Sequence, residues 1–121
     1  MNDLKVSLIQ SDIAWENPDK NLENFGKKLE QITDTPDLIV LPEMFSTGFT
    51  MNVDKCAEEE NGKVVSWLKD QAQRNNCVIA GSVLIEDNDR YFNRFFWMRP
   101  DGTYETYNKR HLFRMGNEHK T

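Results

Sequence analysis

Glu43 has the position in this sequence that most favours chemistry. It follows a short apolar run at residues 37–41 and then Pro42, within the stretch DLIVLPEMFSTGF. Such a run predicts a strand covered on both faces, and open α/β sheets place their sites just beyond the carboxyl ends of strands. Partial burial there would raise the pKa of the carboxyl group and let it transfer protons near neutral pH. The alternative is a solvated loop glutamate.

Lys109 is the second candidate. It lies in the stretch YNKRHLF, where an aromatic strand runs out into a loop. An ammonium group held at that point is a fixed positive charge that could stabilise an oxyanion. The alternative is one of many surface lysines, and the adjacent Arg110 favours that interpretation.

The cysteines and histidines offer poorer chemistry. Cys56 lies next to several acidic residues, which disfavour a thiolate, and Cys77 opens an apolar strand, where a small core residue is expected. His111 and His119 lack the spacing of metal ligands and have no companions. The sequence predicts no metal site and no cofactor.

The elements that would position these residues alternate between strand and helix. Apolar residues recur at helical spacing in two stretches, at residues 17–32 and 62–76, which predicts two amphipathic helices. Strands are predicted at residues 4–12, 37–41, 77–86, 91–99 and 103–113. This order indicates one α/β domain over residues 1–121, with parallel βαβ units first and an antiparallel edge after them. Two helices would leave part of one sheet face bare, as in the front portion of a larger domain.

Composition and charge exclude several classes of function. The net charge is −5 and no stripe of lysine and arginine runs among the aromatic residues, which argues against a nucleic-acid partner. No run of about 20 apolar residues predicts a membrane span, and the opening stretch does not read as a signal peptide. Two cysteines far apart make no disulfide framework, so we expect a reduced, cytoplasmic protein.

Two motifs together resemble the carbon–nitrogen hydrolase (nitrilase) superfamily. LPEMF follows a predicted strand, and YNKRHLF comes much later in the chain. The opening VSLIQSDIAWENPDKNLENF is similar to the first strand and helix of that family. The stretches LPEMFSTGFTM and YNKRHLFRMGNEHK are most similar to its omega-amidase-like branch, which acts on omega-amides of small keto acids.

The resemblance implies a Glu–Lys–Cys triad, with Glu43 as general base and Lys109 as oxyanion stabiliser. A second family glutamate corresponds to Glu118. The family cysteine lies in a segment that would follow Thr121, so the resemblance implies that this chain lacks its nucleophile and is inactive alone. Phe45, Phe49 and Met51 would form part of the wall of the substrate pocket, with loop packing as the alternative.

The fold implied is the N-terminal part of a four-layer α-β-β-α sandwich, commonly paired into dimers or larger oligomers. The partner expected is a small-molecule amide. Other branches of the superfamily remain open: a nitrilase, an N-carbamoyl amidohydrolase or a glutaminase-like domain would use the same triad. From a different class, the chain could be a scaffold or binding module without catalysis, although such a module would not require both Glu43 and Lys109.

Overall fold

The computed structural model describes residues 4–33, 36–48, 50 and 53–112. Within them the helices and strands follow one another as β1 (Val6–Leu8), α1 (Pro18–Glu30), β2 (Leu38–Val40), α2 (Val53–Cys56), α3 (Lys63–Asn75), β3 (Val78–Asp87), β4 (Arg90–Met98) and β5 (Tyr104–Leu112).

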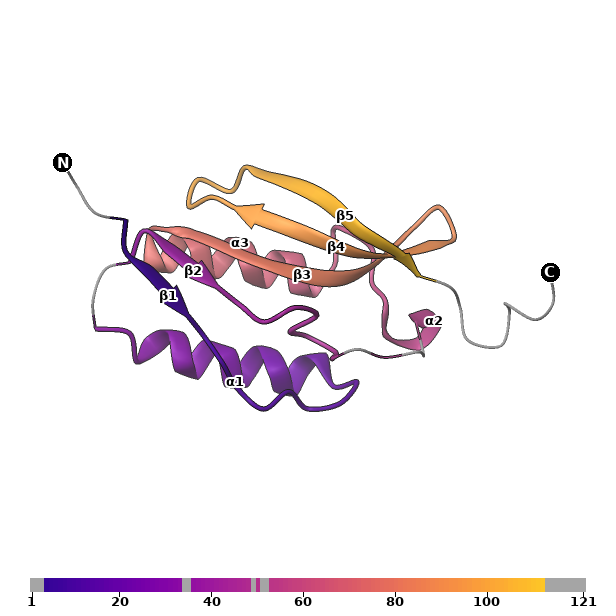
Figure 1. Cartoon of the computed structure of the whole chain (residues 1–121), viewed down its shortest axis with the longest axis horizontal. Coiled ribbons are helices and arrows are strands. Elements are labelled where there is room, and N and C mark those ends of the chain that lie inside the picture. The colour runs from indigo at the N-terminus through magenta and orange to yellow at the C-terminus, as the bar shows by residue number, and fades with distance from the viewer. Residues whose placement is uncertain (1–3, 34–35, 49, 51–52, 113–121) are drawn as a thin grey trace.

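The five strands form one sheet in which they lie in the order of the sequence (Figure 1). β1, β2 and β3 pair in parallel, and β3, β4 and β5 pair antiparallel. The predicted α/β fold, with parallel units followed by an antiparallel edge, is confirmed. The short helix α2 was not predicted; it lies in the stretch between Pro42 and Asn61 that was expected to be a loop.

The two long helices begin in different ways. Asn17 caps α1, its side chain accepting a hydrogen bond from the helix, and Pro18 occupies the first turn. α3 begins after Gly62, which has no side chain to cap with. The carboxylate of Glu58 takes that role, since its Oε2 accepts a hydrogen bond of 2.8 Å from the N–H of Val64. The start of α3 therefore depends on a residue outside the helix.

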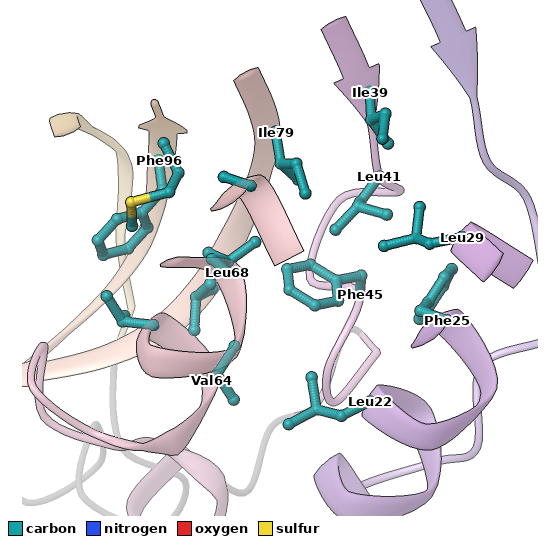
Figure 2. Close-up of a cluster of buried hydrophobic side chains, with 14 of the residues drawn as sticks. Leu22, Phe25, Leu29, Ile39, Leu41, Phe45, Val64, Leu68, Ile79 and Phe96 are labelled. Carbon is teal, nitrogen blue, oxygen red and sulfur yellow. The ribbon is translucent and has the colours of Figure 1, made fainter. Parts of the chain in front are cut away.

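The core lies between one face of the sheet and both long helices (Figure 2). α1 contributes Phe25, which is fully buried and meets the ring of Phe45 edge to face at a centroid distance of 5.7 Å. Phe45 also lies 5.7 Å from the ring of Trp67 on α3. A ring on the loop after β2 thus joins the two helices, and this packing fixes where that loop leaves the sheet.

The opposite face of the sheet is only partly covered. Leu84 and Tyr91 pack there with Met44 from the loop after β2 and Val53 from α2. Elsewhere on this face apolar side chains are exposed: Val6 by 45%, Leu8 by 69% and Tyr107 by 67%. Soluble monomers rarely leave such a surface open, and the bare sheet face expected from the sequence is present among the described residues.

Candidate active site

Glu43 lies just beyond the carboxyl end of β2, as predicted, and is partly exposed. The loop that carries it crosses β3 on the face away from the helices. There the N–H of Met44 donates a hydrogen bond of 2.8 Å to Oγ of the buried Ser82. Nδ2 of the fully buried Asn21 on α1 holds the same loop by donating to the carbonyl oxygen of Ser46 at 2.7 Å. Strand and helix together fix the position of the carboxylate.

Lys109 reaches the same place from β5, at a β-bulge. Asn93 pairs with Arg110 and Arg94 pairs with Asn108, which leaves Lys109 as the extra residue between them. A bulge bends the strand and changes the direction of a side chain, and such bulges are frequent beside active sites. Nζ of Lys109 donates a hydrogen bond of 2.9 Å to Oε2 of Glu43. The two side chains that the sequence singled out therefore lie together, whereas their catalytic roles stay predictions.

The pKa of Glu43 is lowered, not raised as the sequence analysis expected. The hydrogen bond from Lys109 is the main cause. Partial burial raises the pKa, but the hydrogen bond from Asn93 and the charges of Lys109 and Arg110 lower it further. The expectation was wrong because it considered burial without the ammonium partner.

Asn93 is the residue at this site that sequence reasoning missed. It lies on β4 in the middle of the aromatic stretch YFNRFF, is only 1% exposed, and its Nδ2 donates a hydrogen bond of 2.7 Å to Oε2 of Glu43. The signal was available, because a single amide at an inward position of an otherwise apolar strand needs a polar partner.

The predicted pocket residues have different outcomes. Phe45 is fully buried in the core between the two helices, and its role as a pocket wall stays a prediction. Phe49, Met51 and Glu118 lie outside the described residues.

Neither described thiol is activated. Burial raises the pKa of Cys56, and the nearby carboxylate of Glu16 raises it further. Burial also raises the pKa of Cys77, with a smaller contribution from Asp37. Both effects favour the neutral thiol, in agreement with the prediction, although for Cys56 the main cause is burial and not the glutamates that follow it in the sequence.

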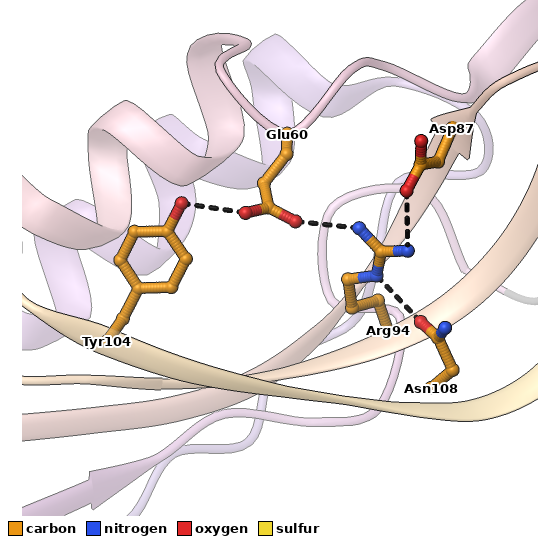
Figure 3. Close-up of polar contacts among 5 residues, drawn as sticks. All are labelled: Glu60, Asp87, Arg94, Tyr104 and Asn108. Atoms are coloured by element: carbon orange, nitrogen blue, oxygen red, sulfur yellow. Dashed lines mark hydrogen bonds and ion pairs between the residues drawn. The ribbon is translucent and has the colours of Figure 1, made fainter.

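A second polar cluster lies on the helix-covered side of the sheet (Figure 3). Arg94, whose side chain is 9% exposed, donates to Glu60 at 2.6 Å, to Asp87 at 3.2 Å and to Oδ1 of Asn108 at 2.6 Å. The hydroxyl of Tyr104 donates to Glu60 at 2.7 Å. These bonds line a groove of 810 Å³ and tie β4 to β5 directly behind the bulge, so they support the strand that presents Lys109.

Among the described residues, no three histidine, cysteine, aspartate or glutamate side chains gather as a metal site would require. In the same part of the chain, no helix is long and apolar enough to cross a membrane. The arrangement therefore offers a carboxylate, an ammonium group and a buried amide, which suit proton transfer and stabilisation of negative charge.

Comparisons with known proteins match this chain along nearly its whole length. The model of the family described as carbon-nitrogen hydrolase matches residues 5–121. The omega-amidase YafV of Yersinia enterocolitica is 44% identical over 119 residues, which cover 98% of this chain and 46% of that protein. The 2-oxoglutaramate amidase of Bacillus subtilis is 32% identical over 117 residues, covering 94% of this chain and 45% of that protein.

Among solved structures, a CN-hydrolase superfamily protein from Xanthomonas campestris is similar with a TM-score of 0.86 and 43% identity. The match covers 99% of this chain and 45% of that one. The chain thus spans about half the length of the curated relatives and of the structure that it matches.

Proposed function

Because this chain belongs to the carbon–nitrogen hydrolase family, we propose that the protein of which it forms part is an omega-amidase, which releases ammonia from the omega-amide of a small keto acid. The observation that supports the proposal most is the contact of 2.9 Å between Lys109 and Glu43 at the carboxyl end of β2. The similarity to an omega-amidase and to a 2-oxoglutaramate amidase supports the substrate class.

Amide hydrolysis needs a nucleophile, a group that stabilises the tetrahedral oxyanion and a proton for the departing ammonia. In our proposal a cysteine from polypeptide beyond residue 121 attacks the amide carbonyl. Glu43 accepts the thiol proton and passes a proton to the leaving nitrogen. It then takes a proton from the water that hydrolyses the thioester, so each half of the reaction restores its starting state.

The lowered pKa of Glu43 fits this sequence of steps. Its ion pair with Lys109 keeps the carboxylate ionised in the resting site, ready to accept a proton. When the tetrahedral intermediate forms, the ammonium group turns part of its hydrogen bonding toward the oxyanion. Its effect on Glu43 then weakens, the pKa of the carboxyl group rises, and donation of the proton to the leaving nitrogen becomes easier.

We further propose that residues 1–121 form the N-terminal portion of one hydrolase domain, as the share of about 46% of the relatives' length suggests. The sheet and its one layer of helices would supply two layers of the four-layer sandwich. The remaining portion would cover the apolar face that exposes Leu8 and Tyr107. On this proposal the 121 residues are inactive alone, and the complete protein is a cytoplasmic homodimer.

The test is a parallel assay of a chain of full family length that includes these residues. 2-Oxoglutaramate, an aliphatic nitrile and an N-carbamoyl amino acid are supplied, and release of ammonia is followed. We expect turnover of the omega-amide, and its loss in Glu43→Gln, which keeps the size of the side chain and removes its basicity. Preference for the nitrile or the carbamoyl compound would place the protein in another branch. No turnover of any of the three would favour a binding module.

A further inference from the structure

We propose that Asn93 is a positioning residue that fixes Oε2 of Glu43 throughout the reaction and leaves Oε1 to carry the proton. The inference rests on the function proposed above and adds a member to its site. Two donors converge on one carboxylate oxygen: Nδ2 of Asn93 at 2.7 Å and Nζ of Lys109 at 2.9 Å. No described residue donates to Oε1, which is therefore the oxygen available to a thiol or a water.

The two donors are held very differently. Lys109 lies at the end of a long flexible side chain that is 39% exposed, and the proposed reaction draws its ammonium group toward the oxyanion. Asn93 has a short side chain, is 1% exposed and projects from the middle of β4. It can therefore keep the carboxylate oriented while Lys109 divides its hydrogen bonds between two partners. An uncharged donor also does so without the strong preference for the ionised form that a second ammonium would impose.

The rest of the Asn93 side chain indicates that its role is not stability. Its Oδ1 is buried, and no described residue donates a hydrogen bond to it. A buried acceptor without a partner destabilises the fold, and an apolar side chain of similar size, such as leucine, would avoid this. An unsatisfied amide in a strand of aromatic residues fits a site where orientation of Glu43 takes precedence over packing.

The charged groups that act on Glu43 among the described residues are Lys109 and Arg110, both on β5. The hydrogen bond from Asn93 lowers the pKa of Glu43 in the same direction as these charges. Its removal should therefore shift the acid limb of the pH profile of kcat/KM to higher pH, because that limb reports the base of the free enzyme.

The experiment uses the complete enzyme with Asn93→Leu, which matches the size of the side chain but cannot donate. A hydrogen bond to a charged group corresponds to a factor of roughly ten to a hundred, so we expect kcat to fall by about that factor. KM should change little, the acid limb should move to higher pH, and the melting temperature should stay the same or rise. Unchanged kcat and an unchanged acid limb would overturn the proposal.

Asn93→Asp serves as the second variant, since it preserves shape and replaces the donor with a carboxylate that repels Glu43. It should move the acid limb further than leucine does. The matched control is Asn108→Asp on the neighbouring strand, whose side chain contacts Arg94 on the other face of the sheet. If Asn108→Asp moves the acid limb as far, the effect is one of general charge and the proposal fails.

A titration of the Glu43 carboxyl by ¹³C NMR separates this inference from the proposed substrate. A higher pKa of Glu43 in Asn93→Leu supports the positioning role even if the enzyme prefers a nitrile or a carbamoyl compound. An unchanged pKa overturns it even if the omega-amide is hydrolysed.

Discussion

Replacing Lys109 by methionine distinguishes a catalytic ammonium from an ordinary ion pair, because the two predict effects of different size. The Lys109 and Glu43 side chains are 39% and 32% exposed, with their charged atoms 2.9 Å apart. Solvent screens a pair of this kind, so its contribution to folding is about 0–1 kcal/mol. Loss of an oxyanion donor instead raises the barrier by about 2.7–4 kcal/mol, a factor of roughly 10²–10³ in kcat.

The assay compares the complete wild-type enzyme with Lys109→Met, measuring kcat on the preferred amide and the free energy of unfolding in urea. We expect kcat to fall by about 10²–10³-fold and the unfolding free energy by no more than about 1 kcal/mol. The pH dependence has a defined sign. The pKa of Glu43 lies below 4.5 because of this ion pair, so its contribution to stability is present above that value and is lost as pH falls through the lowered pKa.

Lys63→Met is the matched control. Lys63 forms an ion pair of 2.6 Å with Asp19 on the helix-covered side of the sheet, and both side chains are largely exposed. The same substitution there removes an ion pair of the same kind without touching the proposed site, so kcat should not change. If Lys109→Met keeps kcat within about threefold of the wild type, or if Lys63→Met loses as much activity, Lys109 is not the oxyanion donor.

The remaining predictions concern the supports of the site. Glu58→Ala removes the carboxylate that caps α3 and should lower the unfolding free energy by about 0.5–2 kcal/mol in urea melts, whereas Glu58→Gln should not. Because burial raises the pKa of Glu58, the wild type should gain stability as pH falls through that raised value, a gain that the glutamine variant lacks. Gly81→Ala places a Cβ 3.2 Å from the ring of Phe45 and should cost about 1–3 kcal/mol by thermal melting; an unchanged melting temperature would show that the ring can move. Ser82→Ala leaves the amide N–H of Met44 without its acceptor and should cost about 1–3 kcal/mol and also lower kcat, while stability lost with full kcat would separate this bond from the position of Glu43.

The fold was predictable because its signals are local. The helical spacing that includes Phe25 in α1 and Leu68 in α3 places both residues in the core, where they are fully exposed to packing and hidden from water. The order of strands and helices then restricted the sheet to parallel units followed by an antiparallel edge. The helix α2 was missed because four residues give too short a period to recognise, and its position depends on contacts of Val53 with the sheet.

The site was predictable only in part. Glu43 and Lys109 follow strands that the sequence reveals, so their approach to one edge of the sheet could be expected. The bulge that directs Lys109 could not, because a register shift between Asn93 and Arg94 depends on pairing across two strands. The direction of the pKa shift of Glu43 failed for a related reason: burial can be read from one segment, whereas the compensating charge comes from another.

The two faces of the sheet explain why a site of this kind lies where it does. On the helix-covered face, Arg94 is held by three partners and the core is closed, which makes β4 and β5 rigid behind the bulge. On the other face the same strands present Asn93 and Lys109 to Glu43 beside an apolar surface that is still open. Covering that surface would remove water from around the carboxylate and strengthen each hydrogen bond that it accepts. Chemistry at Glu43 should therefore depend on whatever covers this face, even where the covering segment supplies no reacting atom.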